Sequence, residues 1–99
     1  MSEKVYTIEE IRALVAPIAQ AYGVERIYLF GSYARGEATP ESDLDFRIDR
    51  GRVRGFQLGG LYNAISDILH KPIDLISSDC LDSEFRNEIS PEEVMIYEQ

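Results

Sequence analysis

Apolar residues recur along the chain in alternating helical and strand-like patterns. From Thr7 to Gly23 they repeat every three or four positions, which predicts an amphipathic helix with one buried face. Thr7 and Glu10 have the spacing of a capping box at the helix start, and Gly23 is a typical stop. Pro17 lacks a backbone N–H group, so we expect a kink there or a break into two shorter helices.

Three short segments predict the strands of a sheet. Residues 25–30, 43–49 and 72–76 are apolar or alternate acid with apolar, and turn-forming residues bound them. A short helix over residues 32–37 and a loop over residues 38–42 separate the first two strands.

A second long amphipathic helix is predicted from Phe56 to Leu69, after a basic loop. It contains Gly59 and Gly60, which cost helix stability and suggest a close approach to another backbone. Towards the C-terminus, residues 81–89 have a helical pattern, and residues 94–97 can form a strand or a helical end.

The predicted order of elements is α-β-α-β-α-β-α, which indicates an α/β (α+β) fold with a small mixed sheet and flanking helices. At 99 residues, the chain fits a single domain spanning residues 1–99 with a thin core. A composition of 44% hydrophobic and 28% charged residues is ordinary for a soluble globular domain.

The charge balance narrows the classes of partner. A formal net charge of −8 argues against a duplex nucleic-acid surface and fits metal cations or a basic protein partner. Cys80 is the sole cysteine, which excludes an internal disulfide and a thiolate metal cluster and fits a reducing cytoplasm. No apolar run of about 18 residues and no signal-peptide pattern occur, so we expect a cytoplasmic protein without a membrane span.

Two aspartates in the second predicted strand are the first candidates for chemistry. Asp43 and Asp45 fall on one face, about 7 Å apart, while Leu44 and Phe46 point into the core. Asp74 lies between apolar residues of the third strand, so we expect three carboxylates in largely buried surroundings. Such carboxylates repel one another unless a cation lies between them, and Mg²⁺ typically binds one or two carboxylates together with substrate phosphates. The alternative is that each acid lies on the solvated face of an edge strand.

A turn before the acids supplies groups that suit a phosphate. Gly31 lets the backbone approach a ligand, and the N–H groups of the following short helix point outward. The Ser32 hydroxyl can donate to a phosphate oxygen, and Arg35 can add positive charge one turn later. Alone, a Gly-Ser turn is common, and Arg35 could be a solvated helix residue.

The stretch GSYARGEATPESDLDF, with ten residues between Ser32 and Asp43, resembles the signature of the DNA polymerase β-type nucleotidyltransferase superfamily. The later Asp74 extends this resemblance. The GSxARG form and the short length resemble the minimal (MNT-type) nucleotidyltransferases, which are often found as antitoxins beside HEPN-domain toxins.

The resemblance implies a polymerase β-like core and transfer of AMP from ATP to a hydroxyl group, a tyrosine of a cognate HEPN RNase toxin. It implies that Asp43, Asp45 and Asp74 are catalytic and bind two Mg²⁺ ions, with Mn²⁺ as the alternative metal. Gly31, Ser32 and Arg35 would hold the triphosphate.

Two other functions stay open at this point. One is an antitoxin of the same fold that masks its toxin by binding, and the other is transfer to a small molecule or an RNA end with help from a partner subunit. Arg50, Arg52 and Arg54 could steer a triphosphate, contact a toxin or form a solvated loop.

Overall fold

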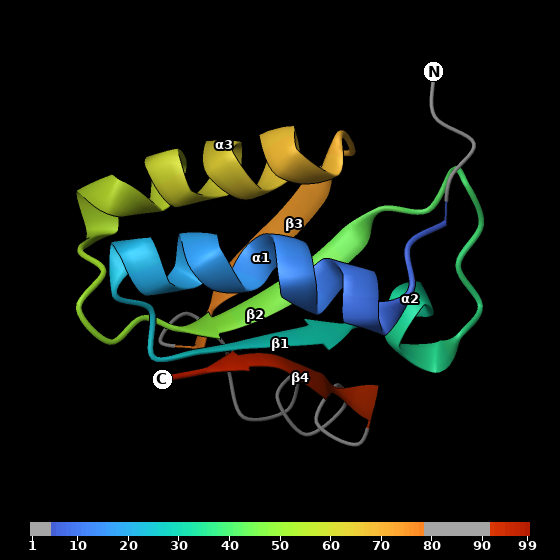
Figure 1. Cartoon of the computed structure of the whole chain (residues 1–99), viewed down its shortest axis with the longest axis horizontal. Coiled ribbons are helices and arrows are strands. Elements are labelled where there is room, and N and C mark those ends of the chain that lie inside the picture. Colours follow the sequence, from blue (N-terminus) through green and yellow to red (C-terminus); the bar gives the residue numbers. More distant parts are fainter. Residues whose placement is uncertain (1–4, 79–91) are drawn as a thin grey trace.

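A computed structural model describes residues 5–78 and 92–99, in which four strands form one mixed sheet (Figure 1). The sheet order is β3-β2-β1-β4. β1 pairs antiparallel with both β2 and β4, whereas β2 and β3 run parallel. This arrangement confirms the expected mixed sheet. The strands are β1 (Arg26–Phe30), β2 (Leu44–Asp49), β3 (Ile73–Ser77) and β4 (Val94–Glu98).

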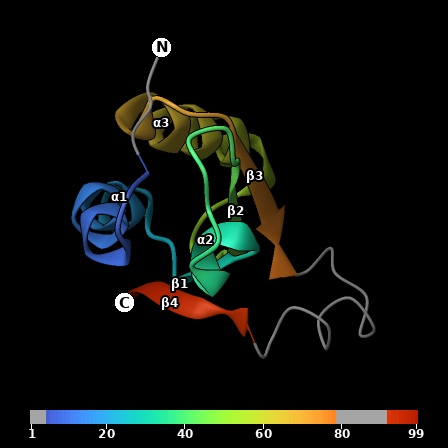
Figure 2. The ribbon, with the colours of Figure 1, turned by 90° about the vertical axis from the view of Figure 1, so that its right-hand side faces the viewer.

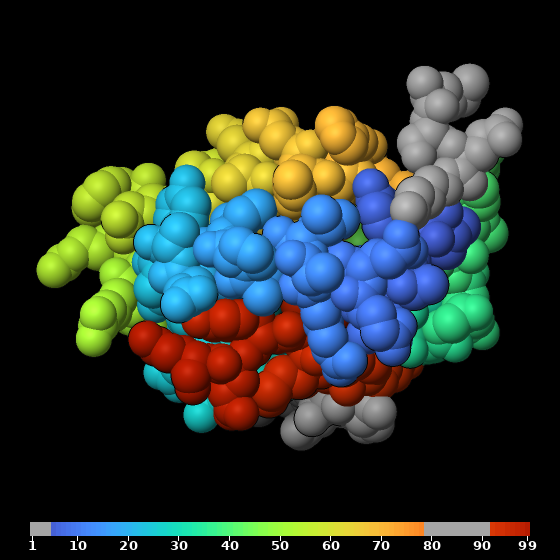
Figure 3. All heavy atoms as spheres, in the orientation of Figure 1, coloured from blue at the N-terminus to red at the C-terminus, as the bar shows by residue number. Residues whose placement is uncertain are grey.

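Two long helices, α1 (Ile8–Tyr22) and α3 (Leu58–Leu69), cover one face of the sheet (Figure 2). The short helix α2 (Ser32–Arg35) follows β1 at one end of the sheet. The 3₁₀ turn η1 (Gly55–Gln57) leads into α3. On the face seen in Figure 3, α1 lies directly beside β4.

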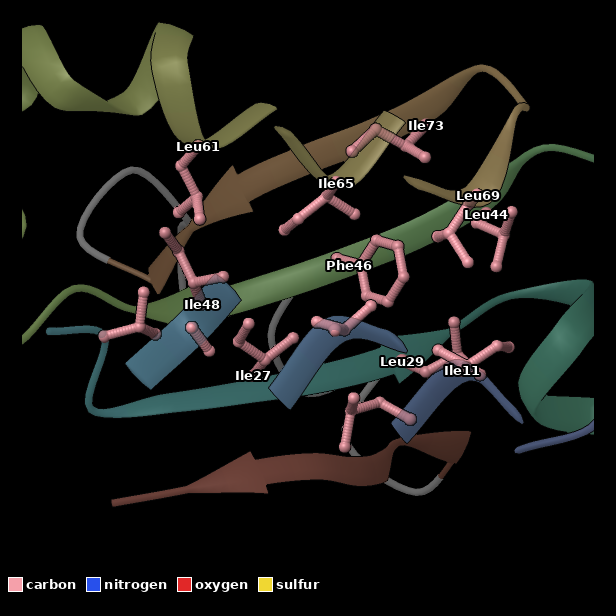
Figure 4. Close-up of a cluster of buried hydrophobic side chains, with 14 of the residues drawn as sticks. Ile11, Ile27, Leu29, Leu44, Phe46, Ile48, Leu61, Ile65, Leu69 and Ile73 are labelled. Atoms are coloured by element: carbon pink, nitrogen blue, oxygen red, sulfur yellow. The ribbon is translucent and has the colours of Figure 1, made fainter. Parts of the chain in front are cut away.

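The core lies between the two long helices and the sheet (Figure 4). Alternation along β2 turns Leu44, Phe46 and Ile48 towards the helices, and each is fully buried. Leu61, Ile65 and Leu69 of α3 and Ile11 and Val15 of α1 belong to the same buried cluster.

The start and the end of α1 are as predicted, but Pro17 does not break it. Thr7 and Glu10 form the expected capping box, and Gly23 ends the helix with a left-handed φ of 78°. The helix continues through Pro17. A proline ring removes a single helical hydrogen bond, and the buried Val15 and Ala19 on either side keep the helix on the core.

Two other expectations are settled in the described residues. Gly60 does approach a neighbour closely, but that neighbour is the Tyr22 side chain and not a backbone, while Gly59 faces open space. The apolar C-terminal segment is a strand, β4, and not a helical end. The helix expected at residues 81–89 and Cys80 lie outside the described residues. Among the described helices, none has the length and apolarity that a bilayer span requires.

Candidate functional site

Strand pairing brings the Gly-Ser turn and two of the three predicted acids together. Asp45 of β2 is opposite Phe30, the last residue of β1, and the turn at Gly31 follows immediately. On its other side, Asp45 is in register with Asp74 of the parallel strand β3. Asp45 therefore lies between the turn and Asp74 at the end of the sheet that carries α2.

Gly31 is held in a conformation that requires glycine. Its φ of 78° and ψ of −155° lie in a region that residues with a side chain avoid. A methyl group at this position would overlap the Asp45 carboxylate. The turn thus brings a bare backbone against the half-buried acid.

The surroundings of the Asp45 carboxyl group have an excess of negative charge. Burial, followed by a hydrogen bond to Asp74 and the charges of Asp74 and Asp43, raises the pKa of Asp45 to about 6. The positive charge of Arg35 acts in the opposite direction but does not offset these effects. A raised carboxyl pKa of this kind marks a place where a bound cation would be favourable.

The three acids differ in burial more than the sequence suggested. Asp45 is half-buried, but Asp43 and Asp74 are exposed, so the expectation of three largely buried carboxylates is wrong. The reason for Asp43 is that β2 begins one residue later, at Leu44, leaving Asp43 in the preceding loop. Asp74 is exposed because it lies on β3, the edge strand of the sheet, on the face opposite the buried Ile73.

Arg35 is near the acids but is engaged elsewhere. Its Nε donates to Glu37 Oε1 at 2.7 Å, and its Nη1 donates to Glu92 Oε2 at 3.1 Å. Arg35 is exposed, and both hydrogen bonds are ion pairs at the surface. A phosphate contact from Arg35 would therefore replace carboxylate partners by phosphate oxygens.

A buried ion-pair network that sequence reasoning missed lies further along the same face of β2. Arg47 is 6% exposed, and its guanidinium forms a two-pronged ion pair with Glu93, at 2.9 Å for the Nη2 to Oε1 bond. It also donates to Ser78 and Asp49 and stacks over the Tyr28 ring at 4.2 Å. The alternation of DLDFRID placed Arg47 on the face of the acids, but no local signal identifies Glu93 as its partner.

The donor set fits a hard divalent cation. Asp45 and Asp74 offer carboxylate oxygens side by side, and Asp43 adds negative charge from the preceding loop. As the side chains are oriented, no three acidic, histidine or cysteine residues among 5–78 and 92–99 form a ready metal-binding group. A third ligand from the chain would require the exposed Asp43 to turn towards the other two.

The sequence matches known proteins over most of its length. A family model described as "Polymerase beta, Nucleotidyltransferase" matches residues 14–99. A Methanocaldococcus jannaschii protein named "Putative protein adenylyltransferase MJ0126" is 34% identical over 96 residues, covering 92% of this chain and 97% of the relative. "Protein adenylyltransferase MntA" of Thermococcus cleftensis is 40% identical over 47 residues, covering 43% of this chain and 48% of the relative.

Solved structures share the fold. The "Structure of putative minimal nucleotidyltransferase" is 27% identical and superposes with a TM-score of 0.77 over 90% of this chain and 95% of that one. A tri-AMPylated Shewanella oneidensis HEPN toxin in complex with MNT antitoxin matches with a TM-score of 0.71 at 14% identity, over 94% of this chain and 74% of that one. A toxin–antitoxin crystal structure with AMP-PNP matches with a TM-score of 0.76 at 16% identity, over 89% of this chain and 73% of that one. The last two likenesses concern the fold alone.

Proposed function

Because the chain belongs to the polymerase beta nucleotidyltransferase family, we propose that it transfers AMP from ATP to a tyrosine hydroxyl of a HEPN-domain toxin. It thereby acts as the antitoxin of a toxin–antitoxin pair. The observation that carries the proposal is the position of Asp45, between Asp74 and the glycine turn at Gly31. The relatives named as protein adenylyltransferases and the likeness to an MNT antitoxin bound to its AMPylated toxin support the choice of nucleotide and acceptor.

In this proposal, the turn binds the triphosphate. The backbone at Gly31 and the hydroxyl of Ser32 contact the phosphate oxygens, and Arg35 exchanges Glu37 and Glu92 for a phosphate group. Asp43, Asp45 and Asp74 would hold two divalent metal ions, which when bound supply charge neutralisation at the attacking and leaving oxygens.

The reaction is an in-line displacement at the α-phosphorus of ATP. The tyrosine oxygen forms a bond to the α-phosphorus, the bond to the bridging oxygen of the β-phosphate breaks, and pyrophosphate leaves. Asp74 accepts the proton of the phenol, a role that suits its exposed position at the edge of the site. The products are the AMP-modified toxin and pyrophosphate.

The test is the intact mass of the protein encoded next to this chain after co-expression with wild type or with the Asp43→Ala/Asp45→Ala variant. We expect a mass gain of one or more AMP units with wild type and none with the double variant. Asp67→Ala is the matched control, because Asp67 is an exposed acid on α3 outside the site, and it should leave the mass gain intact.

Two results would change the proposal. A mass gain that survives the double variant would overturn the roles of the aspartates. A stable complex without any mass gain would favour an antitoxin that masks its toxin by binding, which the fold-level likeness to antitoxins in toxin complexes also accommodates.

A further inference from the structure

The loop between β2 and α3 is a fixed protrusion of the surface. The N–H group of Arg52 donates to the Gly23 carbonyl oxygen at 3.1 Å, and Val53 is buried in the core at 4% exposure. Arg54 and Gln57 exchange two hydrogen bonds, each 2.8 Å long. These anchors hold the tip of the loop in one conformation before any partner arrives.

This loop exposes an aromatic ring that the fold does not use. Phe56 is 83% exposed, whereas the other exposed large hydrophobic residues among those described are 38–40% exposed. The yellow-green atoms of this part of the chain project well beyond the body of the molecule (Figure 3). Scattered exposed apolar residues are normal, but an aromatic ring at this exposure on an anchored loop suits insertion into a pocket.

Other residues near Phe56 also have exposed positions. The Arg54 guanidinium makes no ion pair within residues 5–78 and 92–99, whereas the stem of Arg52 packs over Gly23 at the end of α1. At Gly59, in the first turn of α3, an added Cβ atom would meet no atom of the described residues within 4 Å. Glycine there costs about 0.5–1 kcal/mol relative to alanine without any packing reason among residues 5–78 and 92–99. Tyr62 lies three residues on, on the same side of the helix, and is 38% exposed.

We propose that Arg54, Phe56, Gly59 and Tyr62, here called the Phe56 surface, dock the protein that accepts the nucleotide. The ring of Phe56 enters an apolar pocket of that protein, Arg54 pairs with a carboxylate at its rim, and Gly59 lets its backbone approach α3. Aromatic and arginine side chains are the types that dominate binding energy at protein interfaces. The identity of the partner rests on the proposed function, while the surface rests on the residues named here.

Charge favours a protein over a nucleic acid as the occupant. The loop concentrates three of the ten basic residues within five positions of a chain whose net charge is −8. An acidic patch around a pocket complements this small basic protrusion, whereas nucleic-acid binding requires a broad basic face.

The Phe56 surface and the glycine turn lie at opposite ends of β2 (Figure 1). Asp45 is near the start of this strand, and the loop follows its end at Asp49. The chain measures 34 × 30 × 20 Å, so a partner of similar size can bind the Phe56 surface and still extend to Gly31. Docking and transfer are therefore separable in experiment.

The test is calorimetric titration of the full chain with the purified protein encoded by the adjacent gene. We expect Phe56→Ala and Gly59→Gln each to raise Kd at least tenfold, with Gly59→Gln also raising the thermal midpoint because glutamine is the better helix former. The rate of AMP transfer at saturating partner should stay unchanged. Ile68→Ala, which removes another exposed apolar side chain of α3, is the matched control and should bind as wild type does.

The outcomes separate this proposal from the proposed function. Wild-type Kd in both variants, with AMP transfer intact, would overturn the Phe56 surface and leave the function standing. A second outcome would also overturn the Phe56 surface. If Arg54→Glu and added salt weaken binding, Phe56→Ala does not, and RNA competes with the partner, the loop would be assigned to a nucleic acid. Absence of any binding by wild type would overturn both.

Discussion

Gly31 is the residue at which backbone geometry and the candidate chemistry are most tightly joined. Gly31→Ala forces a side chain into a glycine-only conformation and against the Asp45 carboxylate, so we expect a loss of about 2–4 kcal/mol in the free energy of unfolding. Urea denaturation measures this loss. Transfer should also be absent under conditions where the variant is folded.

Gly36→Ala is the matched control for Gly31→Ala. Gly36 has a similar φ of 74°, but its ψ of 22° is ordinary left-handed backbone, and no atom of the described part of the chain lies within 4 Å of an added methyl group. We expect a loss of about 1 kcal/mol with transfer retained. Equal losses at the two positions would show that the contact with Asp45 has no energetic importance.

Asp45 makes the metal-free protein less stable as pH rises. Its pKa is raised to about 6, so between about pH 4 and pH 6 the folded state holds a proton that the unfolded state has lost. The free energy of unfolding therefore decreases through this window and levels off above it. Because the group is partly exposed, we expect this contribution to be on the order of 1–2 kcal/mol.

Asp45→Asn isolates that contribution. Urea denaturation of both proteins in EDTA at pH 4, 5, 6 and 7 should show the variant gaining stability over wild type as pH rises. Asp49, whose pKa is lowered, contributes equally to both proteins and cancels in the difference. A constant difference across the series would contradict the raised pKa. The variant should be more stable at pH 7 and inactive in transfer.

At the scale of elements, the Arg47 network ties β2 to the residue just before β4. The side chains of Arg47 and Glu93 are each 7% exposed, so Glu93→Ala leaves a buried guanidinium without its main partner. We expect a loss of about 3 kcal/mol in the free energy of unfolding, as measured by urea denaturation. The remaining bonds from Arg47 to Asp49 and Ser78 moderate this loss. Arg47→Met combined with Glu93→Leu should recover most of it, because apolar side chains replace a buried ion pair well.

The surface pairs of Arg26 provide the comparison for this network. Arg26 forms ion pairs with Glu25, Asp49 and Glu98, but its side chain is 37% exposed, and solvent weakens such pairs. Arg26→Ala should therefore cost much less than Glu93→Ala. If the Arg47→Met/Glu93→Leu double variant is as unstable as Glu93→Ala, the network has a structural role beyond charge balance.

The elements were predictable from sequence where their signals are local. The capping box at Thr7, the stop at Gly23 and the strand alternation around Phe46 each need only a few neighbouring residues. Pairings across the chain could not be read in this way. Arg47 and Glu93 are 46 positions apart, and the exposure of Asp74 depends on β3 being the edge strand, which no local pattern reveals.

The juxtaposition of residues in the candidate site was predictable in part for a related reason. Gly31, Asp45 and Asp74 carry signals of conformation and charge that are visible one strand at a time, and the resemblance to a known signature joined them. Their burial was overestimated because alternation tells which face a side chain is on, but not whether that face is covered. Asp43 was assigned to a strand that begins one residue later, because local patterns do not fix the exact end of a strand.

At the scale of the whole molecule, the net charge of −8 opposes the binding of a polyanion such as ATP. The candidate site adds to this opposition, because Asp43, Asp45 and Asp74 are at the same end of the sheet as the glycine turn. We therefore expect ATP binding in EDTA to be at least tenfold weaker than in Mg²⁺, as measured by titration calorimetry.

Ionic strength distinguishes this long-range repulsion from a missing ligand. Salt screens charges over about 10 Å at 0.1 M, so added salt should strengthen ATP binding in EDTA by reducing the repulsion. In Asp45→Asn, which has one negative charge fewer at the site, binding in EDTA should be tighter than in wild type and less sensitive to salt. Equal affinity for ATP with and without Mg²⁺ would contradict both the charge argument and the proposed metal site. If ATP binding requires Mg²⁺ to the same extent at every salt concentration, the requirement comes from direct coordination of the metal by the aspartates and not from the charge of the whole chain.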